Sequence, residues 1–126
     1  MNVSLKGEAQ TPKTCVVFIV VIGAAFIAIG LLDIWRGATP LASRPAHLTG
    51  EDLAVLSIGI AALLGGIWLF KGRNWARWLL AIWMALHVAL SIRNPYVLLV
   101  HLVIFGLILA GLFHPAASSY FRQRDE

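Results

Sequence analysis

The fold of this chain is decided by a short basic turn, Lys71-Gly72-Arg73-Asn74-Trp75-Ala76-Arg77-Trp78, that lies between two long apolar segments. Residues 53–70 before it carry no charge, and residues 79–92 after it are interrupted only by the polar side chains of His87 and Ser91. Lys and Arg beside membrane-spanning helices are retained on the cytoplasmic side, and Trp favours the level of the lipid headgroups. The turn therefore predicts a transmembrane hairpin. The residues expected at its cytoplasmic interface are Lys71, Arg73, Trp75, Arg77 and Trp78.

The composition is that of an integral membrane protein. Of the 126 residues, 60% are hydrophobic and 13% are charged, which is too apolar for a soluble domain with a mostly polar surface. The basic residues are spread among the loops rather than gathered on one face, so we expect no nucleic-acid partner. The single Cys15 excludes an intrachain disulfide and a zinc site built from cysteines.

We expect an all-α, one-domain, four-helix transmembrane bundle. The spans are expected at about 14–35, 51–70, 74–93 and 95–114, each long enough to cross a hydrocarbon core of about 30 Å. Residues 1–13 and 115–126 are expected to be cytoplasmic tails. The longest connection, 37–50, ends near Thr49 and Asp52, whose spacing is typical of a capping box at the start of a helix.

The basic residues also predict the orientation of the four spans. An N-in, C-in topology places seven cations inside and three outside, which agrees with the positive-inside rule. The inner cations are Lys6, Lys13, Lys71, Arg73, Arg77, Arg122 and Arg124, and the outer ones are Arg36, Arg44 and Arg93.

Small residues recur on one side of several spans, and such residues let helix backbones approach closely in lipid. These stripes are more numerous than one four-helix bundle needs. We therefore expect a non-enzymatic protein that associates with itself or with a partner membrane protein in the bilayer. The expected packing residues are Ser57, Ala61 and Gly65, then Ala81, Ala85 and Ala89, then Gly106 and Ala110.

Two histidines are the residues whose spacing in the sequence suggests a cofactor, metal or proton-transfer site. His87 precedes Asn94 by seven residues and His101 follows it by seven, so both lie about 10 Å below the turn of an antiparallel hairpin. They are candidate ligands of a b-type haem or of Zn or Cu, or members of a proton or small-solute pathway. The alternative is that no cofactor binds and the histidines only pack.

The direction in which these histidines face is left open by the pattern. His87 lies with Trp83 and Ser91 on the side of its helix opposite the small stripe. If the alanines make the helix contacts, the histidines face lipid. If the histidines face inward, the alanines face lipid.

Asp33 is the carboxylate of the first span and a further candidate metal ligand, together with His47 from the outer loop. Arg36 follows it at a spacing that also favours a local ion pair. The sequence contains no Ser-His-Asp set at matched depth and no glycine-rich phosphate loop, so no enzyme is expected.

Two further motifs carry a resemblance. The turn Gly72-Arg73-Asn74-Trp75-Ala76-Arg77-Trp78-Leu79 and the tail from Pro115 to Tyr120-Phe121-Arg122 have the patterns G-R-x-W-A-R-W-L and P-x4-Y-F-R. In these motifs the chain resembles small four-span bacterial inner-membrane proteins of uncharacterised role. The resemblance implies a bacterial plasma-membrane location and no particular functional residues.

Overall fold

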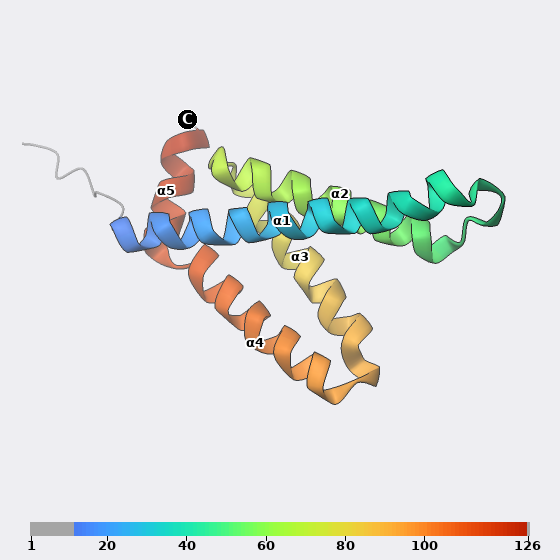
Figure 1. Ribbon diagram of the computed structural model, residues 1–126. Coiled ribbons are helices and arrows are strands. Elements are labelled where there is room, and N and C mark those ends of the chain that lie inside the picture. Colours follow the sequence, from blue (N-terminus) through green and yellow to red (C-terminus); the bar gives the residue numbers. More distant parts are fainter. Residues whose placement is uncertain (1–11, 126) are drawn as a thin grey trace, which may run out of the picture.

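The computed structural model describes residues 12–125, which form five α-helices and two short 3-10 helices (Figure 1). The expected all-α architecture is confirmed, and four of its segments are long and apolar enough to cross a membrane. Residues 1–11, including Lys6, and Glu126 lie outside the described part of the chain. The elements are α1 (Lys13–Ser43), η1 (Pro45–His47), α2 (Gly50–Phe70), α3 (Asn74–Leu90), η2 (Ser91–Arg93), α4 (Pro95–Leu112) and α5 (Pro115–Asp125).

The four long helices form two hairpins. Helices α1 and α2 run antiparallel and side by side (Figure 1). The α3–α4 hairpin is inclined to them. The C-terminal end of α4 therefore lies near α1, and α4 diverges from α1 toward η2. Helix α5 lies across the end of the molecule where α1 begins and α2 ends. This inclination leaves α4 the least buried of the four spans.

Glycines bring α1 and α2 into backbone contact. Gly23, Gly30 and Gly37 on α1 are buried, as are Gly59 and Gly66 on α2, and each set repeats every seven residues, which places it on one helix face. A Cβ at Gly30 would lie 2.5 Å from the Leu63 backbone nitrogen and 2.8 Å from the Gly59 carbonyl oxygen. Only glycine permits such an approach. In lipid the burial of apolar groups does not drive helices together, and the close packing of their backbones does so instead.

Helix α1 is longer than the first expected span and continues through Pro40 to Ser43. A proline here removes the backbone donor for the carbonyl four residues earlier, that of Arg36. The Thr39 hydroxyl donates to this carbonyl instead, at 3.0 Å. Gly37, expected in the connection, is buried against Leu56 of α2. Packing and the threonine hydroxyl thus extend the helix into the predicted 37–50 loop.

The helix starts follow local sequence signals. Thr49 and Asp52 form a capping box at the start of α2, as their spacing predicts. The Asn94 side chain accepts from the backbone N–H groups of Tyr96 and Val97 and so caps α4, in which Pro95 occupies the first turn. The tight end of the α3–α4 hairpin is therefore held by its own residues.

The first three residues of the basic turn, 71–73, contact α5. Gly72 has a φ of 73°, a left-handed conformation that glycine adopts without steric cost. The Arg124 guanidinium donates to the Phe70 carbonyl at 3.2 Å and lies over the Tyr120 ring. The expected C-terminal tail is thus an ordered helix that packs through the buried side chains of Ala117 and Phe121.

Arg77 differs most from the interfacial role expected of it. Its side chain is only 8% exposed and donates to the Leu112 carbonyl and the Ser118 hydroxyl, both at 3.1 Å, as well as to Asn74. The guanidinium also lies over the Phe121 ring, 4.8 Å from its centroid. Arg77 therefore joins the start of α3 to the end of α4 and to α5.

The other expected interfacial side chains lie at the same end of the molecule and are exposed. The Lys71 ammonium is 4.2 Å from the centroid of the Trp68 ring, which in turn lies 5.8 Å from the ring of Trp75. Trp78 meets Phe113 edge to face at 5.0 Å. Arg73 provides the N-cap position of α3.

The small-residue stripes divide into packed and exposed members. Gly65 is buried against Leu80, Ala81 is buried and Ala61 is half-buried, so these three pack within the chain. The remaining expected packing residues are exposed, and a Cβ at Gly106 would meet nothing within 4 Å. The reason is that the heptad glycines hold α1 to α2, whereas α3 turns Trp83 and Met84 inward. The exposed members are Ser57, Ala85, Ala89, Gly106 and Ala110.

Candidate functional site

The structure brings His87 of α3 and His101 of α4 together, as their equal spacing from Asn94 predicts. Their ring centroids are 5.9 Å apart and the ring planes meet at 77°. Both side chains are half-buried and face α1, whereas Ala85 and Ala89 face outward. The histidines thus face inward, with Ala85 and Ala89 exposed as that alternative predicts, although Ala81 of the same stripe is buried.

Trp83 fixes the position of His87. The buried indole donates its N–H to the Ile58 carbonyl of α2 at 3.0 Å and meets Phe26 of α1 edge to face, with centroids 5.0 Å apart. The His87 ring stacks on the indole at 3.8 Å. Contacts with α1 and α2 thereby hold a tryptophan of α3, and this tryptophan holds the imidazole.

The hydrogen bonds determine which ring nitrogens carry protons. His87 Nδ1 lies 3.0 Å from the Trp83 carbonyl oxygen, which only accepts, so this nitrogen donates. The Ser91 hydroxyl donates its one proton to the His87 carbonyl at 2.7 Å. With that proton used, we assign Nδ1 of His101, 2.5 Å from the Ser91 oxygen, as the donor to this oxygen.

This arrangement leaves Nε2 of each neutral imidazole as a hydrogen-bond acceptor. No residue in the 12–125 range donates to either Nε2 atom, so both remain available to a ligand. The site therefore presents two acceptors of the same kind from two neighbouring helices.

The two imidazoles line an apolar cavity of about 250 Å³ between α1, α3 and α4. On the α1 side the exposed residues Val21, Ala25 and Ile29 form its rim, together with Ile104 of α4. We call this space the histidine cavity. Its lining consists of Val21, Ile22, Ala25, Phe26, Ile29, Trp83, Met84, His87, His101, Ile104 and Ile108.

Asp33 and His47 do not belong to the histidine cavity. The Asp33 side chain lies against Gly59 in the α1–α2 interface, where a Cβ on that glycine would be 2.8 Å from the Asp33 Cβ atom, and His47 is exposed in η1. Among residues 12–125, no group of three or more His, Cys, Asp or Glu side chains is placed to hold a metal ion. Among the residues that line the histidine cavity, the side chains that carry metal-ligating atoms are those of His87, His101 and Met84.

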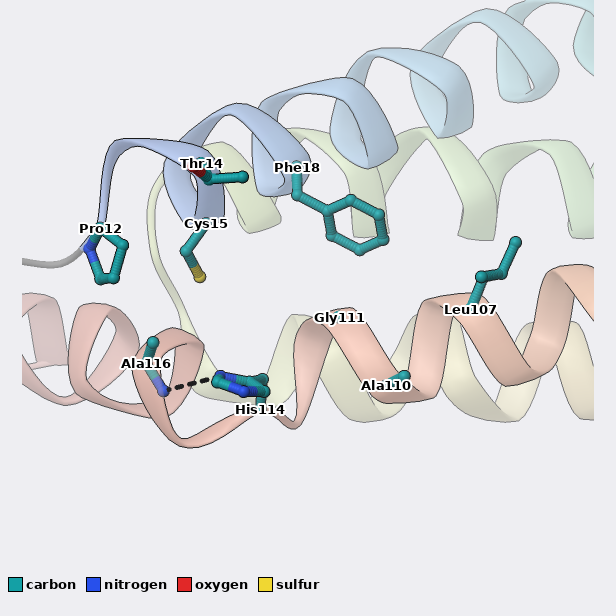
Figure 2. A pocket seen from close by; sticks show the side chains of 9 residues that line it. All are labelled: Pro12, Thr14, Cys15, Phe18, Leu107, Ala110, Gly111, His114 and Ala116. Atoms are coloured by element: carbon teal, nitrogen blue, oxygen red, sulfur yellow. Dashed lines mark hydrogen bonds between the residues drawn. The ribbon is translucent and has the colours of Figure 1, made fainter.

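A second cavity, of about 450 Å³, lies where the start of α1 approaches the end of α4 and the start of α5 (Figure 2). Its wall is apolar except for Thr14, Cys15 and His114. The nitrogen Nδ1 of His114 accepts from the Ala116 backbone N–H at 3.2 Å and so caps α5. Figure 2 shows the Phe18 ring reaching toward α4, where it fills the place that a side chain at Gly111 would take. Of the polar residues in this wall, Thr14 and Cys15 belong to α1 and His114 to the α4–α5 connection, and no hydrogen bond joins His114 to the other two among the described residues.

Trp83 and Ser91 position the histidines. The sequence placed both on the same helix side as His87 but did not indicate what they do. Trp83, His87 and Ser91 share one helix side because each lies four residues from the next. The hydrogen bond from Trp83 to Ile58 joins helices whose relative placement the sequence does not show. The seven-residue glycine repeat of α1 and α2 was the available signal for that placement.

Two neutral acceptors in an apolar cavity can hold a hydrogen-bond donor or a proton. Compared with known proteins, the chain matches no family model, no curated protein and no solved structure.

Proposed function

We propose that this is a non-enzymatic, multi-pass membrane protein that binds a small ligand in the histidine cavity. The observation that carries the proposal is that two half-buried imidazoles, each fixed by a hydrogen bond at Nδ1, line a common apolar cavity. Small-ligand sites in proteins combine mostly apolar walls with a few fixed polar groups. The histidine cavity has this character, and its polar groups are held by four hydrogen bonds in which Trp83, His87, Ser91 and His101 take part.

The route to the site is through the lipid. The rim residues Val21, Ile29 and Ile104 are exposed and apolar, and they lie in segments that can cross a membrane. A ligand dissolved in the hydrocarbon core thus reaches the imidazoles without crossing a polar surface. This favours an apolar molecule with a small polar part.

We further propose a bacterial plasma-membrane location with both termini in the cytoplasm. The excess of cations in the two ends and the 71–77 turn supports this orientation. The resemblance of the turn and tail motifs to small bacterial inner-membrane proteins supports the location. Labelling of single cysteines from outside intact cells, in a Cys15→Ala background, tests it: a cysteine at His47 should react, and one at Gln123 should not.

The first experiment is an analysis of what the protein retains. Full-length protein in mild detergent is examined by absorption spectroscopy, metal analysis and mass spectrometry of extracted small molecules, beside the His87→Ala/His101→Ala double variant. We expect a small molecule, haem or metal that is depleted in the variant. Identical contents in both proteins would contradict the proposal, and His47→Ala serves as the control for loss of a histidine.

Association of the chain with itself is the second candidate function. Ala85 and Ala89 of α3 and Gly106 of α4 are small, exposed and unused within the chain, and α4 is the least buried span. Small residues on a lipid-facing surface permit close helix contacts. Crosslinking in native membranes should yield a dimer or larger species that Gly106→Leu weakens and that Val100→Ala, at an exposed position on another side of α4, does not. A monomer alone, without any partner, would rule this candidate out.

A further inference from the structure

From the shape and hydrogen-bonding character of the histidine cavity, we infer that its ligand is a neutral single-ring hydroxyaromatic molecule, of the phenol or 1,4-dihydroxybenzene class. This inference rests on the proposed function and names the chemical class of its ligand. It follows from three properties of the cavity: the polarity of its hydrogen-bonding groups, its volume and the nature of its walls.

The hydrogen-bonding groups of the cavity call for a donor. Both imidazoles use Nδ1–H as a donor within the protein, His87 to the Trp83 carbonyl and His101 to the Ser91 hydroxyl. The remaining Nε2 atoms accept. A carbonyl compound or an ether offers only acceptors and would leave both Nε2 atoms unpaired, which is costly in an apolar space. A hydroxyl group satisfies an imidazole directly, and a ring with two hydroxyls satisfies both.

The charge of the cavity walls calls for a neutral ligand. No Lys, Arg, Asp or Glu side chain lines the histidine cavity. An anion or cation would therefore lose its hydration without gaining a partner of opposite charge, and this penalty is large in an apolar surrounding. A neutral hydroxyaromatic molecule also partitions into lipid, which agrees with the apolar rim at Val21, Ile29 and Ile104.

The volume and walls of the cavity favour one ring. An apolar cavity of about 150 Å³ is known to hold benzene, and the histidine cavity measures about 250 Å³. A substituted single ring fits this space, and a longer apolar chain attached to the ring would leave through the rim into lipid. Phe26 and Trp83 supply aromatic surface for ring contacts at the inner wall.

The test compares two ligands that share a ring and a chain, of which one carries two O–H donors and the other carries methyl groups in place of those protons. The probes are 1,4-dihydroxy-2-butylbenzene, handled under a reducing atmosphere, and its dimethyl ether, which retains the ring and the chain but has no O–H group. Binding to the full-length protein in lipid nanodiscs is measured by isothermal titration. The proteins compared are the wild type, the His87→Leu/His101→Leu double variant and His47→Leu, which removes an exposed histidine outside the cavity.

We expect the dihydroxy compound to bind the wild type at least about tenfold more tightly than the dimethyl ether, since two hydrogen bonds are worth about that much. The preference should disappear in the double variant and persist in His47→Leu. Equal binding of both probes to the wild type, lost in the double variant, would overturn the inference while leaving the proposed site in place. No binding of either probe to the wild type would overturn the inference, and binding unaffected by the double variant would overturn the inference and show that these probes bind elsewhere.

Discussion

The Ser91 hydroxyl lies 2.5 Å from Nδ1 of His101 and at the same time donates to the His87 carbonyl, so that one buried side chain joins η2 to α4 and to the last turn of α3. Among the described residues, the Ser91 side chain connects the two histidines through hydrogen bonds. The orientation of His101 depends on it, because no other described residue bonds to that ring. A defect at Ser91 should therefore affect stability and ligand binding together.

Ser91→Ala is expected to lower the free energy of unfolding by about 1 kcal/mol, since it removes the hydrogen bond to the half-buried imidazole of His101. It should also weaken binding of the dihydroxy probe about fivefold, because His101 loses its fixed orientation. Ser57 is the matched control: its hydroxyl also donates to the carbonyl four residues earlier, at 2.8 Å, but it is exposed. Thermal unfolding in detergent that ranked Ser57→Ala as the more damaging change would contradict this role.

A glycine packed in the α1–α2 interface and an exposed glycine of α4 should differ in how their substitution changes stability. Gly30→Ala would place a methyl group 2.5 Å from the Leu63 backbone nitrogen, which cannot move without shifting the helix. We expect a loss of about 2–3 kcal/mol from overpacking. Gly106→Ala meets nothing within 4 Å and should leave stability unchanged or raise it by up to about 1 kcal/mol through helix propensity. The midpoints of thermal unfolding in detergent decide between them, and equal midpoints would show that the helices are not in backbone contact.

Arg77 is expected to be required for the docking of α5. Arg77→Met removes the hydrogen bonds to Leu112 and Ser118 and should destabilise the protein by about 2–3 kcal/mol, because these are charge-assisted bonds in a buried setting. Arg77→Lys should be intermediate, since an ammonium lacks the planar fork of the guanidinium. The readout is the rate of proteolytic cleavage within α5.

Arg93, which is exposed in η2 at the other end of α3, provides the control for this experiment. Arg93→Met removes the same charge without touching α5. Cleavage of α5 at the same rate in the Arg77→Met and Arg93→Met proteins would show that Arg77 is not what holds this helix.

Gly72 predicts a backbone effect at the basic turn. Gly72→Ala forces a side chain into a φ of 73°, which costs about 1–2 kcal/mol, and brings its methyl group against the Arg124 side chain. Gly50→Ala is a suitable comparison, because Gly50 begins α2 and a Cβ there meets nothing within 4 Å. Urea unfolding in detergent should show a loss only for Gly72→Ala, and an unchanged midpoint would mean that the turn adopts another conformation.

The sequence by itself determined that the four long apolar segments are helices, and it determined the pairing of the histidines in depth. Long uncharged segments must be helical in lipid because their backbone groups have no other partners there. The starts of α2 and α4 follow from Thr49 with Asp52 and from Asn94 with Pro95, since capping acts within a few residues. The equal distances of His87 and His101 from Asn94 likewise required only a tight turn between two helices.

Only the tertiary structure decided which face of each helix is inside. Most positions on both sides of each span are apolar, so hydrophobicity alone does not distinguish a lipid-facing side from a packed one, and the alanines of α3 were as plausible inside as His87. The choice depends on contacts between distant segments: the Gly30–Gly59 approach sets α1 against α2, and the bond from Trp83 to Ile58 then orients α3. For the same reason the burial of Arg77 beneath α5 and the extension of α1 to Ser43 arise from packing partners that lie far away in the chain.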